Sequence, residues 1–158
     1  MLTLKIYIDA SYGVHADGKS HTGSNATLGN ANITAKSTKQ KLVAKSSTEA
    51  ELIAASDSVS TAIHCRNFLE AQGYKLPPVT VFQYNMSTIA MIRAGKPTSD
   101  RSRHVNIRFF FLHDRENLGE IKVEHLPTKQ MLADVLTKPL QGDLFLSLRD
   151  QLLNWTSN

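Results

Sequence analysis

The chain has 158 residues, a length that suits one domain, so we expect a single domain over residues 1–158. Hydrophobic residues make up 41% of the sequence and charged residues 20%, which supplies a core and argues against global disorder. The net charge of +4 permits a polyanionic partner without requiring one. The single cysteine excludes an internal disulfide, and no apolar run is long enough for a membrane span. We therefore expect an intracellular protein, in the cytoplasm or nucleus.

The first third of the sequence predicts an antiparallel meander. Residues 2–9 alternate apolar and polar side chains, which predicts a strand that closes at Asp9. Residues 10–23 contain three glycines and are interpreted as a turn-rich connection. Residues 24–28 and 31–36 predict two further strands, joined by a turn at Gly29 and Asn30.

Helices and strands alternate in the rest of the chain. Ser46 followed by Glu49 is typical of a capped helix start, and this helix is expected to run to about Gln72 and end at Gly73. An antiparallel start followed by helical crossovers predicts an α/β fold, with a mixed sheet and helices on its faces. The later elements, in the order strand, helix, helix, strand, helix and C-terminal helix, are predicted over residues 78–84, 87–94, 105–118, 120–125, 131–136 and 140–155.

Three acidic residues lie at the ends of predicted elements. Asp9 closes the first strand, Glu51 lies in the first turns of the long helix, and Asp134 lies in the short helix after the last strand. Such ends can converge on one rim of a sheet, where clustered carboxylates repel each other unless a hard cation such as Mg²⁺ binds them. Two such ions can align a water and a leaving oxygen for phosphodiester hydrolysis. The alternatives are a turn former, a helix-dipole partner and a solvated surface group.

Basic residues form two groups in the sequence. Two basic groups beside an acidic rim suit a site that follows a nucleic-acid backbone, and the alternative is two solvated faces. The first group is Lys36, Lys39, Lys41 and Lys45, and the second is Arg101, Arg103, His104 and Arg108.

Five segments carry a resemblance to a known family. They are YIDASYG, AKSTKQKLVAKSSTEAELIAAS, NMSTIAMI, RSRHVNIRFFFLHDRENLGEI and LPTKQMLADVLTKPL, and they span roughly residues 5–150. Together they resemble the ribonuclease H domain that ends copia-type LTR-retrotransposon polyproteins. The resemblance implies a ribonuclease H-like fold, with a five-stranded mixed sheet whose first three strands are antiparallel, flanked by helices. It also implies cleavage of the RNA strand of RNA–DNA hybrids by two Mg²⁺ ions on four carboxylates. The reverse transcriptase portion of the same polyprotein is an implied partner.

The resemblance assigns three of those four carboxylates. The first falls on Asp9, and the second falls on Glu51, with Glu49 as the alternative. The fourth falls on Asp134 within LAD. Asp9, Glu51 and Asp134 are therefore the expected catalytic and metal-binding residues.

The third carboxylate position holds Tyr84, where the family usually has an aspartate before the asparagine. A phenol stays protonated at neutral pH and is a poor Mg²⁺ ligand. A second departure is Asn106, where the family often has aspartate. We therefore expect impaired hydrolysis, and the alternative is a catalytically dead module that binds nucleic acid or protein on the same fold. The residues expected to contact the substrate are Lys36, Lys39, Lys41, Arg101, Arg103, His104 and Asn85.

Overall fold

Five strands form one mixed sheet, which confirms the α/β fold expected from the sequence. The structure, a computed structural model, describes residues 2–95 and 103–155, apart from the side chains at positions 103 and 104. The strand order is β3-β2-β1-β4-β5, with β1, β2 and β3 antiparallel and with β4 and β5 parallel to β1. The strands are β1 (Leu4–Ser11), β2 (His21–Leu28), β3 (Ala31–Lys39), β4 (Val79–Gln83) and β5 (Ile121–His125).

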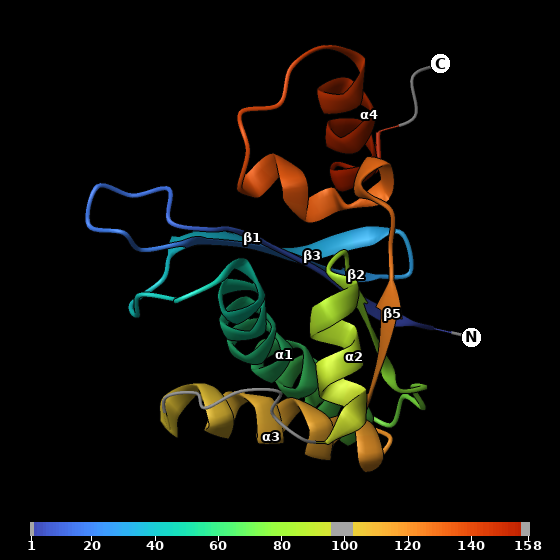
Figure 1. Ribbon diagram of the computed structural model, residues 1–158. Helices are drawn as coiled ribbons and strands as arrows, with labels where there is room; N and C mark the ends of the chain where they lie inside the picture. Colours follow the sequence, from blue (N-terminus) through green and yellow to red (C-terminus); the bar gives the residue numbers. More distant parts are fainter. Residues whose placement is uncertain (1, 96–102, 156–158) are drawn as a thin grey trace.

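Helices cover the two faces of the sheet unequally (Figure 1). One face, which we call the helical face, carries α1 (Ser47–Ala71), α2 (Met86–Ala94) and α3 (Arg103–Asn117). The opposite face, which we call the η2 face, carries two 3₁₀ helices, η1 (Thr128–Gln130) and η2 (Leu132–Leu136), and the helix α4 (Gly142–Leu152). Within the described residues, no helix combines the length and the apolar composition that crossing a bilayer requires.

The first strands are longer than the sequence pattern indicated. β1 continues past Asp9 to Ser11, because its last residues still pair with the start of β2. β2 accordingly begins at His21, inside the segment interpreted as a connection, and β3 continues to Lys39. The prediction that the strand closes at Asp9 was therefore wrong by two residues, since backbone pairing continues where side-chain alternation has stopped.

Asp9 nevertheless lies at a special point of the sheet. Parallel pairing between β1 and β4 ends at Ile8 and Gln83, one residue before Asp9. The carboxyl ends of adjacent parallel strands are a common location for functional sites in α/β folds. The topology therefore directs attention to the end of β1.

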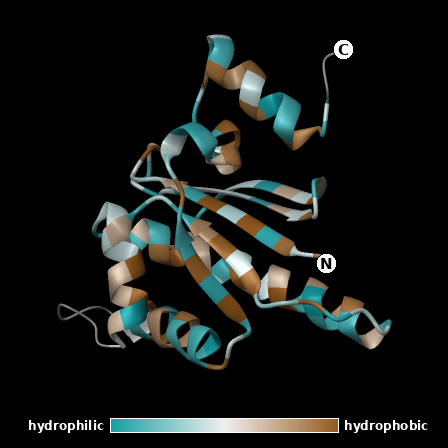
Figure 2. Cartoon of the chain, turned by 90° about the vertical axis from the view of Figure 1, so that its right-hand side faces the viewer, coloured by the Kyte–Doolittle hydropathy of each residue, from teal (hydrophilic) through white to brown (hydrophobic). Residues whose placement is uncertain are grey.

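The helical face holds the main hydrophobic core. Side chains alternate between faces along a strand, and Figure 2 shows hydrophobic and hydrophilic residues mixed along the strands and along α4. Ile6, Ile8 and Val81 are buried in the core cluster, and α1 adds the fully buried Leu52 and Val59. This packing ties β1, β4 and α1 into one unit.

The long helix begins and ends where the sequence predicts. Ser46 is the N-cap of α1, and its hydroxyl accepts a hydrogen bond from the backbone N–H of Glu49 at 3.2 Å. Gln72 is the C-cap, and Gly73 follows with a φ of 90°, a conformation that glycine adopts without strain. Because the cap fixes where α1 begins, it also fixes the position of Glu51 near the start of the helix.

The helix α3 carries two apolar stripes, of which one is buried. Phe109 and Leu112 are fully buried in the core cluster. Ile107 and Phe110 are 60% and 50% exposed on the same helix. Because both stripes have helical spacing, the sequence pattern alone does not decide which one faces the core.

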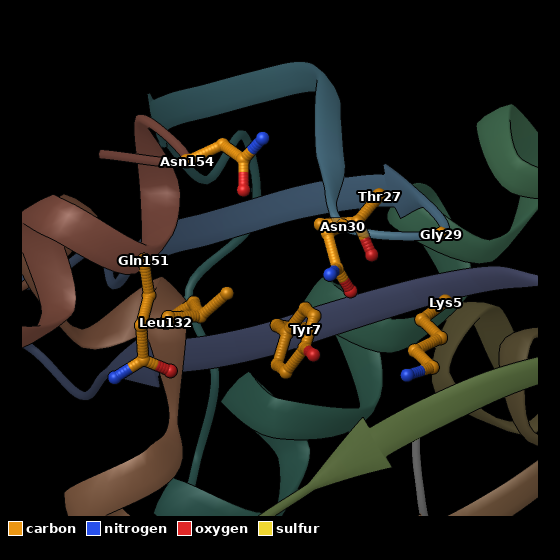
Figure 3. A pocket seen from close by; sticks show the side chains of 8 residues that line it. All are labelled: Lys5, Tyr7, Thr27, Gly29, Asn30, Leu132, Gln151 and Asn154. Carbon is orange, nitrogen blue, oxygen red and sulfur yellow. The ribbon is translucent and has the colours of Figure 1, made fainter. Parts of the chain in front are cut away.

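The η2 face contains a pocket beside Tyr7. The pocket has a volume of 170 Å³ and lies between the sheet and α4. Figure 3 shows the ring of Tyr7 rising from β1, with Leu132 of η2 and Gln151 of α4 to one side of it and Asn154 farther off.

Candidate active site

Two carboxylates share one ammonium at the C-terminal end of β1. Asp9 and Asp134 are only 3% and 1% exposed. The Nζ of Lys138 lies 2.8 Å from Oδ1 of Asp134 and 3.3 Å from Oδ2 of Asp9. The hydroxyl of Thr137 donates a hydrogen bond to the same Oδ2 of Asp9. The segment from η2 onward thus supplies a carboxylate, a hydroxyl and an ammonium to one place.

A close backbone approach positions η2 on the sheet. A Cβ atom built on Gly23 of β2 would lie 2.8 Å from the carbonyl oxygen of Ala133, closer than real contacts allow. The hydroxyl of Ser37 on β3 donates a hydrogen bond of 2.7 Å to the carbonyl of Leu136. The absence of a side chain at Gly23 therefore lets η2 carry Asp134 to the sheet.

Glu51 reaches the same region from α1. Its carboxylate is 6% exposed, and Oε1 accepts a hydrogen bond of 3.3 Å from the backbone N–H of Ala10. In the described part of the chain, Oε2 of Glu51, Nε2 of Gln83 and Oδ2 of Asp134 are buried without a hydrogen-bond partner. Gln83 is 1% exposed at the end of β4, and its amide still lies near enough to stabilise the Glu51 charge. Two of these atoms are carboxylate oxygens with capacity for a further partner.

The charges of the three carboxylates influence one another. Burial, followed by the charge of Asp9, raises the pKa of Glu51 to about 8. Burial also raises the pKa of Asp134, and the ammonium of Lys138 opposes that rise. Burial alone would lower the pKa of Lys138, but Asp134 and Asp9 stabilise its charge and the net shift is upward. Asp9 therefore lies beside both Glu51 and Asp134, and we call these three residues the carboxylate cluster.

Tyr84 occupies the position to which the resemblance assigns the third carboxylate. The residue follows β4, is 49% exposed, and has its ring 6.1 Å from the ring of His125, centroid to centroid. Asn85 is occupied elsewhere, because its Oδ1 caps α2 by accepting hydrogen bonds from the backbone N–H groups of Ser87 at 2.9 Å and Thr88 at 3.2 Å. The structure gives Asn85 a helix-capping role and shows nothing of a substrate role.

Glu49, the alternative to Glu51, serves the start of α1. Its Oε2 accepts a hydrogen bond of 2.8 Å from the backbone N–H of Lys45. Its own N–H is bonded to the Ser46 hydroxyl, so both groups belong to the helix cap. The geometry therefore favours Glu51 as the member of the carboxylate cluster.

A second feature, which we call the basic groove, lies between β2, β3, α1 and α3 with a volume of 550 Å³. Hydroxyl groups of β2, β3 and α1 line it together with basic side chains. The basic residues are Lys36, Lys39, Lys41 and Arg108. Three predicted substrate residues therefore line one groove, together with an arginine of the second basic group.

The basic side chains of the groove have partners in the protein. The Nζ of Lys39 lies 2.7 Å from Oδ2 of Asp17, and Arg108 forms an ion pair with Asp57. These pairs are partly exposed, so they cost little to exchange for another anion. The predictions for Arg101 and for the side chains of Arg103 and His104 lie outside the described residues.

Retrotransposon polyproteins match nearly the whole chain. The Ty1-ER2 Gag-Pol polyprotein of Saccharomyces cerevisiae is 31% identical over 153 residues, which cover 96% of this chain and 9% of that protein. The Pol polyprotein from transposon RE1 of Arabidopsis thaliana is 30% identical over 152 residues, which cover 96% of this chain and 10% of that protein. No protein-family model matches the chain.

Solved structures match the fold. LC11-RNase H1, isolated from compost by a metagenomic approach, has a TM-score of 0.61 at 15% identity, covering 86% of this chain and 93% of that one. Its structure in complex with an RNA/DNA hybrid gives a TM-score of 0.60 at 13% identity, covering 85% and 93%. The chain is a ribonuclease H-like domain of a retrotransposon polyprotein.

The ribonuclease H-like domain offers donors that suit a hard divalent cation. Carboxylate oxygens are the preferred protein ligands of such ions, and Oε2 of Glu51 and Oδ2 of Asp134 are buried and unpartnered. Among the residues that the structure describes, no three His, Cys, Asp or Glu side chains are already gathered around one point. The donor chemistry therefore fits a metal, while the arrangement places the ammonium of Lys138 between Asp9 and Asp134.

Sequence reasoning missed several groups that organise this site. Lys138 and Thr137 lie in the quoted segment LPTKQMLADVLTKPL, but neither was singled out. The spacing of four residues between Asp134 and Lys138 was a usable signal for an ion pair. Gln83 and Gly23 carried no comparable signal, because their roles depend on neighbours distant in sequence.

Proposed function

We propose that this ribonuclease H-like domain binds RNA–DNA hybrids and hydrolyses the RNA strand slowly, with divalent metal held by Asp9, Glu51 and Asp134. One observation supports the proposal: at the end of β1, Asp9 shares the ammonium of Lys138 with Asp134, and Glu51 is bonded to the N–H of the next residue, Ala10. The structural neighbour solved with an RNA/DNA hybrid supports the choice of substrate. The chain spans 9% and 10% of the two relatives' lengths. The proposed activity therefore concerns this domain and not a whole polyprotein.

The protein groups around the carboxylates have definable tasks. The hydroxyl of Thr137 orients Asp9, and the backbone N–H of Ala10 orients Glu51. A bound Mg²⁺ pair would supply a metal-activated water and charge stabilisation for the leaving oxygen. Burial of Asp9 and Asp134 keeps bulk water from screening that charge.

Tyr84 is the proposed cause of slow hydrolysis. A site for two cations needs enough negative charge to hold both, and a neutral phenol removes one charge from the family's set. The half-exposed ring beside His125 offers no carboxylate oxygen to replace it. The domain should therefore bind a second ion poorly even where it binds one.

The test is a hybrid-cleavage assay in Mg²⁺ with the wild type and Tyr84→Asp. We expect the substitution to increase the cleavage rate at least about tenfold, since an aspartate at this position restores a charged ligand. Tyr74→Asp is the matched control, because Tyr74 is comparably exposed but lies after α1. Brisk cleavage by the wild type, with no gain from Tyr84→Asp, would overturn the proposed impairment. Absence of cleavage in both proteins, with hybrid binding retained, would favour the binding-module alternative.

We assign hybrid binding to the basic groove. A hybrid exposes phosphates and 2′-hydroxyls, and each phosphate neutralised by a lysine adds roughly one unit to the slope of log affinity against log salt. Replacing Lys36, Lys39 and Lys41 with alanine should therefore flatten the slope by about two to three units. The control is Lys75→Ala with Lys122→Ala, which removes lysines that do not line the groove. An unchanged slope in the triple variant would remove the groove from the binding site.

The reverse transcriptase portion of the same polyprotein is the proposed protein partner, and an intracellular location is proposed with it. Retrotransposon relatives roughly ten times the length of this chain support a larger functional chain. Pull-down of a separately expressed reverse transcriptase segment would test the contact. Failure to bind at concentrations of about 10 μM would argue against a stable interaction.

A further inference from the structure

The carboxylate cluster contains a positive charge of its own. Lys138 is four residues after Asp134. Its ammonium forms ion pairs with both Asp134 and Asp9 of β1. The lysine side chain is 39% exposed, whereas those of Asp9 and Asp134 are 4% and 2% exposed. The ammonium therefore reaches two buried carboxylates from the solvent side.

This placement has an electrostatic reason. Two buried carboxylates close together are costly unless a cation compensates them. Glu51 lies close by as well, because its Oε1 is bonded to the backbone N–H of Ala10, the residue after Asp9. In the absence of divalent metal, Lys138 is the cation bonded to Asp9 and Asp134 in the described part of the chain.

We propose that Lys138 is a built-in cation that holds Asp9 and Asp134 together and must leave their oxygens before a divalent ion binds between them. The inference rests on the proposed function in one respect, namely that the cluster accepts a divalent cation. The ammonium and the metal compete for Oδ2 of Asp9 and Oδ1 of Asp134. Because binding free energy is spent on displacing the lysine, apparent metal affinity is lower than the carboxylates alone would give.

Tyr84 makes this competition more effective. A divalent ion is favoured over an ammonium when several carboxylates surround it, and the position after β4 contributes none. Lys138 is also held close to Asp134 by the chain itself, because it follows the 3₁₀ helix η2 that carries Asp134. A metal ion in solution lacks this advantage. The lysine therefore acts as a positioning residue whose removal changes metal affinity and metal-free stability in opposite directions.

The experiment compares wild type with Lys138→Met, which keeps the chain length and removes the charge. In EDTA we expect Lys138→Met to melt several degrees lower, because the buried carboxylates lose their counter-ion. Mn²⁺ binding, followed by electron paramagnetic resonance, should become roughly tenfold tighter, because the competing cation is gone. Lys129→Met is the matched control, since it removes a nearby exposed lysine on η1 and should change neither quantity.

Two further measurements keep the inference testable if Lys138→Met folds poorly. Lys138→Arg should retain the metal-free melting temperature, because a guanidinium can still bond both carboxylates. In the wild type, the nitrogen NMR signal of the Lys138 ammonium should change on titration with Mg²⁺ as the ammonium moves to solvent.

The outcomes separate this inference from the proposed function. Equal or weaker Mn²⁺ binding by Lys138→Met, or an unchanged melting temperature in EDTA, refutes the built-in cation whatever the hybrid assay gives. Tighter Mn²⁺ binding without any hybrid cleavage supports it and counts against the proposed hydrolysis alone.

Discussion

On its helical face the sheet meets α1 through closely packed aliphatic side chains, whereas on its η2 face it meets a short segment rich in polar contacts. Leu52 and Val59 are fully buried against the first face. On the second face, Asp9 contacts Thr137 and Lys138. The difference teaches that stability and chemistry are supplied by opposite sides of one strand.

The contrast follows from the alternation of side chains along β1. Ile8 points into the hydrocarbon of the helical face, and the next residue, Asp9, points to the opposite side. Glu51 comes from the helical face, because α1 passes close enough for its carboxylate to accept a hydrogen bond from the N–H of Ala10. The carboxylate cluster is thus assembled from both faces at the place where β1 and β4 part.

The largest expected effect comes from breaking the helical face. Phe109→Ala should lower the free energy of unfolding by about 3–5 kcal/mol, because the ring is fully buried and its loss leaves a cavity. Urea unfolding measures the change. Phe110→Ala is the control, since this neighbour on α3 is half exposed and should cost under about 1 kcal/mol. Similar losses in both variants would contradict the assignment of the buried stripe.

The junction between the two faces should be nearly as sensitive. Gly23→Ala should destabilise the domain by about 1–3 kcal/mol, because the new methyl group meets the backbone carbonyl of Ala133. It should also weaken metal binding, since η2 carries Asp134. Calorimetric melting and Mn²⁺ titration measure the two effects. Unchanged stability would show that η2 can move outward without loss, and the close approach would then have no structural importance.

In the carboxylate cluster, a substitution should increase stability rather than decrease it. Glu51→Gln should raise the metal-free free energy of unfolding at neutral pH by about 1–2 kcal/mol. Burial raises the pKa of Glu51 to about 8, so folding at neutral pH takes up a proton at this carboxyl, and glutamine avoids that cost. The measurement is urea unfolding in EDTA. Such a trade between stability and function is common at active sites.

Glu49→Gln is the matched control for that substitution. Glu49 is equally buried, but its carboxylate is bonded to the N–H of Lys45 at the start of α1. Its substitution should lower stability by about 0.5–1 kcal/mol through loss of a charged cap contact. If both substitutions had the same sign, the distinction between a cap residue and a cluster residue would fail.

The sequence predicted the helical face better than the η2 face, for physical reasons. Alternation along residues 2–9 and the cap at Ser46 report local preferences, and both correspond to observed elements. The extension of β1 to Ser11 depends on pairing with β2, which residue patterns do not encode. The close approach at Gly23 likewise depends on a segment more than a hundred residues later.

The candidate site was predicted in its carboxylates and not in their surroundings. Asp9, Glu51 and Asp134 came from element ends and from the family resemblance. The structure places Asp9 beside the other two, and their catalytic and metal-binding roles stay a prediction. The ammonium of Lys138 was not foreseen, although its spacing from Asp134 permits an ion pair. Acidic residues attract attention as ligands, whereas a lysine beside them is recognised only once its distances are known.

A further small effect is expected at Asn85, which separates a role in the fold from a role in binding. Asn85→Ala should lower the free energy of unfolding by about 1 kcal/mol, because two N–H groups at the start of α2 lose their acceptor. Ser87→Ala is the control, since this exposed residue offers only its backbone N–H to the cap. Hybrid affinity, measured at a temperature where both variants are folded, should be the same for both. A selective loss of affinity in Asn85→Ala would show that the amide contacts the substrate as well as the helix, and the division between the two faces would then extend to the end of β4.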